Sequence, residues 1–464
     1  MKKTEQMVVI TNKLKIDTKY ENHIRSGWKE IAQEIADRIV DIRKHQKNSV
    51  VKIAIDGYVG INWDVIVENV NEMLDAHQIN THFFNIQQCL KSQQELEKQF
   101  ESYLGNDSVF GRLYKKSLKT LFEYSKLSSL KKSIQNITND QPNSVVICFG
   151  TGASFLFRRK HWSVVIYCDL TREESLKRNK QWMSQTGTQS ISPKKLYYID
   201  FQVSDKHRNQ WLSKIDFYID GNDAATPIMI SKKLLDSVTA ELASSPFALK
   251  YLYEPGPWGG QWLKKIRNLP EEWVNCAWSY EVIAQEQSLL VALNDETVLD
   301  IPWTTFLYLQ YDRIMGNVDK RRFDGQFPIR YDYLDTMDGG DLSIQVHPPT
   351  PYIRRNFSEP YHQGEMYYIV ETRVGARVNL GLNTETKKEE FHEAAKLADE
   401  KGIPFDYRKF VNSVPVQKHD LLLIPPGTVH GSGEGIVVLE ISSTTYRYTF
   451  KIYDHLRPDL NGVM

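Results

Sequence analysis

Short apolar runs alternate with amphipathic segments through the first half of the chain. A strand is predicted at 51–57, where a β-branched run ends in a glycine turn. Similar buried-strand candidates follow at 144–149, 163–168 and 215–219. Helical periodicity predicts amphipathic helices around 24–44, at 63–77 and at 171–182, after a short strand-like start. Strands that alternate with helices in this way predict a parallel sheet with helices layered on it.

The pattern changes after about residue 250. The segment 226–250 is predicted to be a helical connection, and Pro and Gly cluster at 255–260. From there strand-like runs with turns dominate, and 387–401 is the one clear helix, so this half is predicted to be mainly β. A chain of 464 residues is too long for one ordinary core. We therefore predict an α/β domain over 1–235 and a mainly-β domain over 245–464.

The composition is that of a globular protein, and charge separates the two halves only mildly. Apolar residues make up 41% of the chain and charged residues 25%, with a formal net charge of zero. Residues 1–250 carry 36 Lys and Arg against 28 Asp and Glu, whereas residues 251–464 carry 22 against 30. This imbalance fits two separately built units, but it is too small to predict binding of nucleic acid.

Cysteine spacing and the lengths of the apolar runs indicate in which cellular compartment the protein is expected. The four cysteines lie far apart without a Cys-x-x-Cys pair, so neither a disulfide framework nor a cysteine zinc site is predicted. No run approaches the ~20 apolar residues that span a bilayer. We therefore expect a cytoplasmic protein that binds no membrane, while the oligomeric state stays open.

Four polar residues in the second half suit a divalent metal ion. Gln345 and His347 lie two apart in an apolar run, so on a strand both side chains leave the same face, which Ser343 shares. Glu365 lies in another strand-like run, and His430 ends a tight Pro-Pro-Gly turn. Two imidazoles, a carboxylate and an amide oxygen suit an ion such as zinc, with a coordination position left for substrate.

This half resembles the class I mannose-6-phosphate isomerases, sugar isomerases built on a cupin-type (jelly-roll) β-barrel. The matching segments occur in the family's order, and they are Tyr253–Gly260, Ser279–Val282, Phe327–Asp335, Leu342–Pro348, Gly427–His430, Gly435–Glu440, Thr445–Arg447 and Tyr453–Arg457. The resemblance implies one Zn²⁺ per chain, held by Gln345, His347, Glu365 and His430, with Arg447 as the active-site arginine. It also implies interconversion of mannose 6-phosphate and fructose 6-phosphate, or of a related sugar.

Two departures from the family bear on the substrate. Gln363 and Asp332 stand where relatives usually carry lysines near the substrate, with Arg330 close to the second position. The loss of two cations weakens the attraction for a phosphate dianion, unless other basic residues replace them. The sequence thus leaves open whether the substrate is phosphorylated. The alternative function is a non-catalytic sugar-binding or regulatory protein derived from isomerase and kinase domains.

Aldose–ketose isomerisation moves a proton between C1 and C2 of the sugar, and this sets what the site must contain. A zinc ion would polarise the carbonyl group, and Arg447 would hold a developing oxyanion. For the base, the sequence leaves three alternatives: a zinc-bound water, His362 and Glu281.

The first half, from about residue 50 to 225, resembles P-loop kinases of the uridine-kinase type in layout. The strand at 53–57 opens a loop, and the strand at 164–169 precedes an arginine-bearing helix. A Walker A loop needs glycine, lysine and a hydroxyl residue, whereas Asn62, Trp63 and Asp64 stand in those places. We therefore predict a degenerate P-loop-like domain that serves as a scaffold, ligand sensor or assembly surface. The basic run 158–160 is either an anion site or a solvated face.

Overall fold

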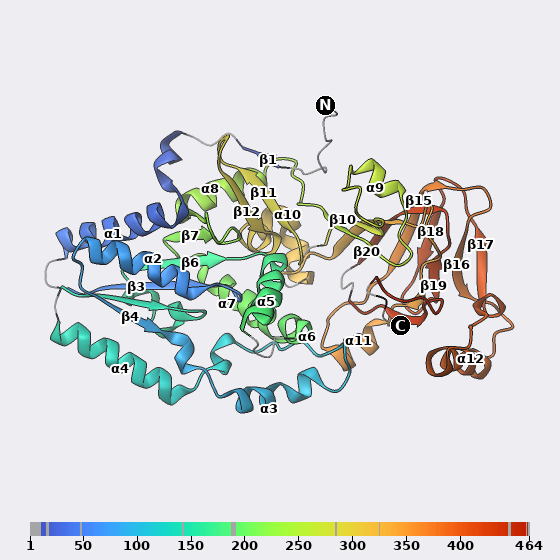
Figure 1. Cartoon of the computed structure of the whole chain (residues 1–464), viewed down its shortest axis with the longest axis horizontal. Coiled ribbons are helices and arrows are strands. Elements are labelled where there is room, and N and C mark those ends of the chain that lie inside the picture. The colour runs from blue at the N-terminus through green and yellow to red at the C-terminus, as the bar shows by residue number, and fades with distance from the viewer. Residues whose placement is uncertain are drawn as a thin grey trace. The chain divides into compact units, whose positions relative to one another are not determined.

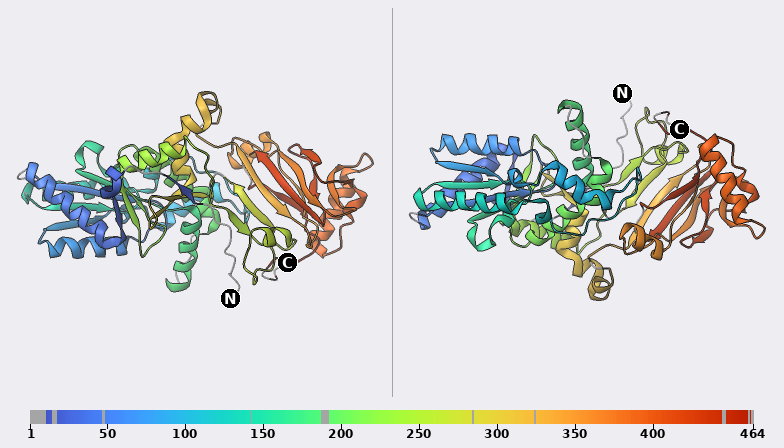
Figure 2. Two further views of the ribbon diagram at one scale, coloured as in Figure 1. Left: turned by 90° about the horizontal axis from the view of Figure 1, so that it is seen from above. Right: turned by 90° about the horizontal axis from the view of Figure 1, so that it is seen from below.

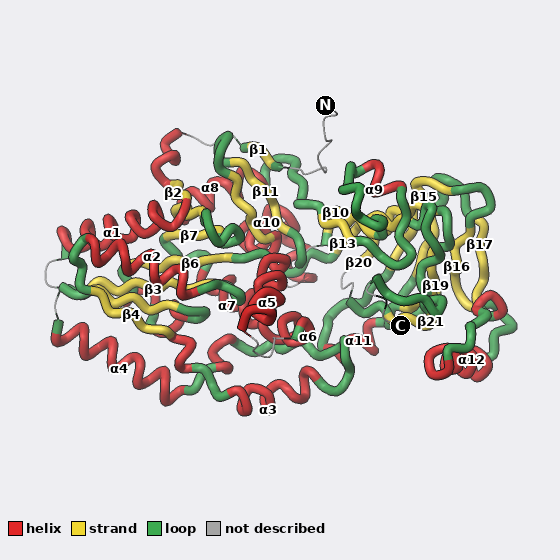
Figure 3. Tube along the Cα trace, viewed as in Figure 1, coloured by secondary structure: helices red, strands yellow, loops and turns green. Residues whose placement is uncertain are grey.

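The computed structural model describes residues 11–14, 18–46, 49–141, 143–186, 192–283, 285–323, 325–443, 447–460 and 462 (Figure 1). They fall into two compact units. The α/β unit contains residues 11–248 and 288–325, and the β unit contains residues 249–287 and those from 326 onward. Helices dominate the first and strands the second (Figure 3). The part of the predicted strand-like start before residue 11 lies outside the described residues.

A seven-stranded sheet forms the centre of the α/β unit, in the order β2-β8-β7-β6-β3-β5-β4. Strands β3 to β7 pair in parallel, and β8 and β2 pair antiparallel at one edge. The strands are β2 (Ile24–Ser26), β3 (Val51–Gly57), β4 (Thr81–Asn85), β5 (Val145–Phe149), β6 (Val164–Asp169), β7 (Phe217–Asp220) and β8 (Ile228–Ser231). Because both faces of β5 and β6 are covered, nearly every residue in them is apolar and buried. The parallel sheet that the sequence pattern predicts is therefore present.

Helices cover both faces of this sheet (Figure 2). The described α-helices of residues 18–248 are α1 (Gly27–His45), α2 (Trp63–Ala76), α3 (Gln93–Leu104), α4 (Tyr124–Asp140), α5 (Arg172–Thr186), α6 (Pro193–Lys195), α7 (Phe201–Trp211) and α8 (Lys232–Leu242), with a π-helical turn at Leu196–Asp200. Helix α1 buries Ile31, Ile35 and Ile39 at the spacing of one helical face. One prediction is wrong at its start. The segment 226–250 begins with β8 rather than with helix, because its Ile-Met-Ile run pairs with β7.

The segment 288–325 joins the α/β unit although it lies beyond the predicted boundary at 245. Its strands β11 (Ser288–Ala292) and β12 (Val298–Pro302) form a small sheet with β1 (Asn12–Lys13), and helix α10 (Trp303–Phe323) follows. Hydrogen bonds fix it to the carboxyl ends of two parallel strands. Thr305 Oγ1 donates to Asp169 Oδ2 at 2.5 Å, and the Asp300 backbone N–H donates to Asp220 Oδ2 at 2.7 Å. The segment therefore supplies one of the hydrogen bonds of each strand-end carboxylate, beside those from Tyr218 to Asp169 and from Asn222 to Asp220.

The loop after β3 is filled by its own side chains. Tyr58 is 1% exposed, and its ring stacks on Phe201 with the centroids 6.1 Å apart. Its hydroxyl donates to Asp205 Oδ1 at 2.8 Å, while the Arg208 guanidinium lies 5.2 Å from the ring centre. Ligands of open α/β sheets usually bind at such a loop, outside the carboxyl ends of the strands. A phosphate here would have to displace Tyr58, which agrees with the absence of Walker A chemistry at 62–64.

Asp220 makes the stability of the α/β unit depend on pH. Burial and the nearby Asp300 carboxylate raise the pKa of Asp220 to about 7. Because the folded-state pKa lies above the unfolded value, this carboxyl group stabilises the fold below about pH 4, and that contribution is lost as the pH rises through about 7. We expect the free energy of unfolding to fall between about pH 5 and about pH 8, on the order of a few kcal/mol. Asp300→Asn should make that fall smaller.

Urea unfolding at the two pH values, read by hydrogen exchange in β6 and β7, measures this dependence. Asp140→Asn is the matched control, because Asp140 is an exposed carboxylate at the end of α4. An Asp300→Asn variant with the pH dependence of the parent would show that the two carboxylates do not interact.

The β unit consists of two antiparallel sheets. The six-stranded sheet has the order β18-β15-β20-β13-β10-β9, and the five-stranded sheet has the order β17-β16-β19-β14-β21. The strands are β9 (Leu252–Glu254), β10 (Trp278–Val282), β13 (Ile329–Asp335), β14 (Ile344–Val346), β15 (Glu365–Thr372), β16 (Arg377–Leu382), β17 (Val411–Pro415), β18 (Leu421–Ile424), β19 (His430–Ser432), β20 (Ile436–Ser443) and β21 (Phe450–Tyr453). A buried core that includes Tyr367, Val378 and Val438 holds the sheets together. This half is mainly β, as predicted.

Helix content in the second half exceeds the prediction of a single clear helix. The predicted helix is present as α12 (Lys388–Lys401), and α9 (Trp262–Ile266), α10 and α11 (Thr350–Phe357) are additional. The sequence does not show the periodicity of one continuous helix over α10, because the helix is interrupted at Gly316, whose φ is 71°. Helix α11 has only 8 residues and begins at a Pro-Thr-Pro sequence.

Two further expectations concern disulfide bonds and helices that could span a membrane. All four cysteines are buried and free, so the described fold contains no disulfide, as predicted. Among the described residues, no helix combines the length and the apolar character needed to cross a membrane.

Candidate metal centre

Three strands and a turn bring the predicted ligands together inside the β unit. In the five-stranded sheet, Gln345 on β14 pairs directly opposite His430 at the start of β19. His347 follows β14 immediately, and Glu365 begins β15 in the six-stranded sheet. Residues from both sheets therefore meet between them, although up to 85 residues of sequence separate them.

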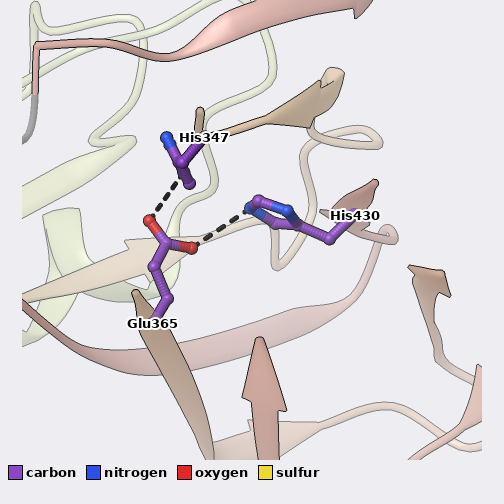
Figure 4. A group of neighbouring side chains, drawn as sticks. All are labelled: His347, Glu365 and His430. Carbon is purple, nitrogen blue, oxygen red and sulfur yellow. Dashed lines mark ion pairs between the residues drawn. The ribbon is translucent and has the colours of Figure 1, made fainter. Parts of the chain in front are cut away.

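The carboxylate of Glu365 lies between two imidazoles (Figure 4). His347 Nε2 is 2.8 Å from Glu365 Oε1, and His430 Nε2 is 3.1 Å from Glu365 Oε2. One ligand atom from each residue lies within 4.8 Å of the others. All three side chains are almost completely buried, with at most 3% of their surface exposed. The predicted cluster is therefore compact and shielded from water.

The contacts of the two histidine Nδ1 atoms determine which nitrogen of each ring faces the carboxylate. His430 Nδ1 is 2.9 Å from the Thr428 carbonyl oxygen, and His347 Nδ1 is 3.3 Å from the Tyr448 carbonyl oxygen. Because a carbonyl only accepts, both Nδ1 atoms must carry the proton. In neutral histidines the Nε2 lone pairs then point at the carboxylate oxygens, and either a metal ion between them or a proton on each Nε2 satisfies these atoms. Moreover, His347 Nε2 and Glu365 Oε2 are buried without a hydrogen-bond partner. The residues present fit a divalent ion.

Gln345 lies beside the cluster with its amide nitrogen toward it. Its Nε2 is 3.3 Å from His430 Nε2, and its Oε1 accepts a hydrogen bond from Ser343 Oγ at 3.1 Å. The prediction was an amide oxygen as ligand, and rotation of the amide by half a turn would place it there. Ser343 shares the face of Gln345, as its spacing predicts.

Burial and the contacts with the two imidazoles act on the Glu365 carboxyl in opposite directions. Burial alone would raise the pKa of this carboxyl, but the neighbouring His347 and His430 hold it well below its usual range. The site therefore presents an ionised carboxylate, which is the form that a metal ion requires.

A second polar cluster lies next to the first on the inner face of the six-stranded sheet. Arg330 forms ion pairs with Asp332 Oδ1 at 3.1 Å and Glu440 Oε1 at 3.3 Å. Burial raises the pKa of Asp332 to about 6, and burial with the Glu365 carboxylate raises that of Glu440 well above its usual value. Gln363 Nε2 donates to Glu365 Oε1 at 2.5 Å and lies 3.4 Å from Glu440 Oε1. Gln363 therefore connects the two clusters.

Sequence reasoning named Arg330 and Asp332 only as replacements for lysines, and it missed Glu440. The signal that would have found Glu440 is strand register, since it pairs directly with Asp332 on β13 and with Tyr367 on β15.

Gln363→Leu should weaken metal binding by about 10- to 100-fold. The leucine is similar in volume but removes the donor that orients Glu365, and losses of this size are usual when an outer hydrogen-bond partner of a ligand is removed. Titration with Co²⁺, followed by its visible absorption, measures the affinity. Gln417→Leu, at an exposed position of the same unit, should bind like the parent. Equal affinities in both variants would show that Gln363 does not orient the carboxylate.

The other predicted site residues lie at different places in the β unit. Arg447 Nη2 is 3.3 Å from Glu286 Oε1, and its side chain is 31% exposed. His362 Nδ1 is 2.5 Å from Thr350 Oγ1. Glu281 accepts from Ser279 Oγ at 2.8 Å and pairs with Arg267. The roles of these residues stay predictions.

The chain matches known proteins of two kinds, one through a family model and one through individual relatives. A family described as a domain of unknown function (DUF8485) matches residues 27–244. Mannose-6-phosphate isomerase ManA of Bacillus subtilis is 26% identical over 226 residues, which are 48% of this chain and 64% of that protein. The probable mannose-6-phosphate isomerase GmuF of the same organism is 32% identical over 143 residues, or 30% of this chain and 41% of that protein.

About half of this chain is similar to mannose-6-phosphate isomerases. The crystal structure of the Bacillus subtilis mannose 6-phosphate isomerase matches with 22% identity and a TM-score of 0.39, over 47% of this chain and 64% of that chain. The chain thus spans less than two thirds of the isomerases that it matches.

Proposed function

We propose that the β unit is a metal-dependent aldose–ketose isomerase acting on mannose 6-phosphate and fructose 6-phosphate, or on a related sugar. The observation that carries this proposal is the arrangement of His347 and His430, whose Nε2 atoms face one ionised carboxylate. The similarity of about half the chain to mannose-6-phosphate isomerases supports the reaction class.

In this proposal one Zn²⁺ per chain is held by His347, Glu365 and His430, with Gln345 after rotation of its amide. The ion would polarise the carbonyl of the sugar and so ease proton transfer between C1 and C2. Arg447 would donate hydrogen bonds to the oxygen that gains negative charge. His362 and Glu281 are the side-chain candidates for the base, and Gln363 keeps the Glu365 carboxylate in place.

We assign the β unit to the cupin-type barrels and the α/β unit to degenerate P-loop-like domains. Two facing antiparallel sheets with the metal ligands between them support the first assignment. The parallel order β7-β6-β3-β5-β4, with a loop after the central strand that Tyr58 fills, supports the second. In this view the α/β unit transfers no phosphoryl group.

The second polar cluster supports the alternative function, a non-catalytic sugar-binding or regulatory protein. Asp332 and Glu440 both pair with Arg330, so its charge is already matched inside the barrel. A phosphate dianion close to this cluster would meet carboxylates rather than lysines.

An exchange experiment separates the two functions. The purified full chain is stripped of metal with a chelator, reloaded with Zn²⁺, and incubated in D₂O with mannose 6-phosphate, fructose 6-phosphate, mannose or fructose. Isomerase activity predicts interconversion of aldose and ketose, with deuterium appearing at C1 of the ketose and at C2 of the aldose, and it predicts that both changes require the metal. Stoichiometric metal without turnover of any of these sugars would establish the non-catalytic function instead.

A further inference from the structure

A basic groove lies in the α/β unit, and Tyr58 is not among the residues that line it. It has a volume of about 710 Å³, which is within the range of small-molecule sites. Helix α4, the 3-10 helix η4 (Ala153–Leu156) with the segment after it, and the end of α7 supply its walls. Its cationic lining residues are Lys119, Lys131, Arg158, Arg159 and Lys214, and no Asp or Glu lines it. The groove includes Arg158 and Arg159 of the basic run 158–160, for which the sequence allows either an anion site or a solvated face.

Most of this positive charge is not neutralised by the protein. Arg159 is engaged, because its Nη2 lies 2.8 Å from both carboxylate oxygens of Asp216. Among the residues with described side chains, the other four cations of the lining form no ion pair. An excess of cations around a concave surface attracts anions, and phosphate is an anion that Arg and Lys side chains bind through strong charge-assisted hydrogen bonds.

Aromatic side chains form the floor between these cations. Phe155, Phe157 and Trp211 line the groove, and Phe155 and Phe157 are half-buried. Lys119 Nζ lies 5.4 Å from the ring centre of Phe155, and Lys214 Nζ lies 5.3 Å from that of Trp211. Each ammonium group is thus held at the edge of an apolar surface. A ligand with a ring and a phosphate group could contact both features together.

We propose that this groove binds a small organic phosphate. Its phosphate would pair with Lys131 and Arg158, and its ring would lie against Phe155 and Phe157. Two sources offer this chemistry, namely nucleotides and sugar phosphates. The site is independent of the β unit, so the proposal stands whether or not the β unit is an isomerase.

Occupancy of the groove should stabilise the α/β unit. The Phe155 ring packs against His207 with the centroids 5.8 Å apart, and His207 Nε2 is 2.7 Å from the buried carboxylate of Asp56 on β3. A ligand held on Phe155 is therefore linked through His207 to strand β3 of the sheet. Binding to the folded state alone raises the temperature of unfolding as the ligand concentration rises.

Calorimetric titration of the full chain with ATP, AMP, mannose 6-phosphate and inorganic phosphate tests the proposal. Lys131→Glu and Arg158→Glu should each weaken the organic phosphates by about 10-fold or more, the usual effect of losing a charged hydrogen bond. The matched controls are Lys132→Glu and Lys160→Glu, which alter exposed cations outside the groove. They should bind within about 2-fold of the parent, while added salt weakens binding to all folded variants.

The organic phosphate that binds more tightly shows whether the ligand is a nucleotide or a sugar phosphate. Unchanged circular dichroism shows that the variants are folded. Mannose 6-phosphate that binds equally to the parent and to both groove variants would be occupying the β unit. The proposal is wrong if no organic phosphate binds more weakly to the groove variants than to the controls. Binding of a single-stranded oligonucleotide, with none of the small phosphates, would likewise overturn it.

Discussion

His430→Ala is expected to leave the β unit folded but unable to retain a metal ion. The imidazole of His430 supplies one of three groups within 4.8 Å, and the methyl group of alanine cannot coordinate. Zinc affinity should fall by more than the roughly 10- to 100-fold that the loss of an outer hydrogen-bond partner costs. Isomerase activity, if the proposed function is correct, should fall with it. Metal analysis after dialysis, together with Co²⁺ titration, measures the loss.

The matched control for this variant is His392→Ala. His392 is exposed on α12 of the same unit, so its removal should change neither the metal content nor the affinity. Equal metal content in His430→Ala and the parent would refute the placement of the metal centre.

Arg208→Met should destabilise the α/β unit by about 3–5 kcal/mol, the usual result of leaving a buried charge without its partner. The Arg208 side chain is 1% exposed. Its Nη2 lies 3.0 Å from Asp205 Oδ1, and its Nη1 lies 3.4 Å from Asp169 Oδ1. It also donates to Thr304 Oγ1 at 2.8 Å. Methionine fills much of the volume but matches neither carboxylate. Urea unfolding read by hydrogen exchange in β6 and β7 measures the loss.

The effect of this variant should depend on pH. Burial raises the pKa of Asp169, and Arg208 opposes that rise, so the variant raises the pKa further. A raised folded-state pKa means that stability is lost as the pH increases, and the destabilisation should be greater at about pH 8 than at about pH 5. Lys206→Met, an exposed change on the same helix, should have little effect. Arg208→Met/Asp169→Asn should recover part of the loss, and no recovery would show that Asp169 is not the stranded charge.

The sequence predicts the strands of the α/β unit well where local pattern and tertiary burial agree. The run 51–57 is β-branched and buried on both faces, and it forms β3 with those bounds. The position of 288–325 could not be predicted in the same way. Its place depends on carboxylates at 169 and 220, more than 75 residues earlier in the chain, and no local pattern reports such a pairing.

The candidate site likewise contains residues that local pattern predicts and residues that depend on distant parts of the chain. Gln345 and His347 share a strand face by their spacing alone, which is a local property. The contact of Glu440 with Gln363 instead depends on which strands are neighbours. A carboxylate opposite another carboxylate is unusual in strand pairs, so Asp332 and Glu440 gave no pattern to recognise.

The discontinuity of the α/β unit has a consequence for its synthesis. The chain leaves this unit after residue 248 and returns at residue 288. A ribosome must therefore release residues through 305 before Asp169 can bond to Thr305 and Asp220 to the Asp300 backbone N–H. A gene truncated near codon 245 would yield a polypeptide in which, among the described residues, Asp169 keeps only Arg208 and Tyr218 as side-chain partners, and Asp220 keeps only Asn222.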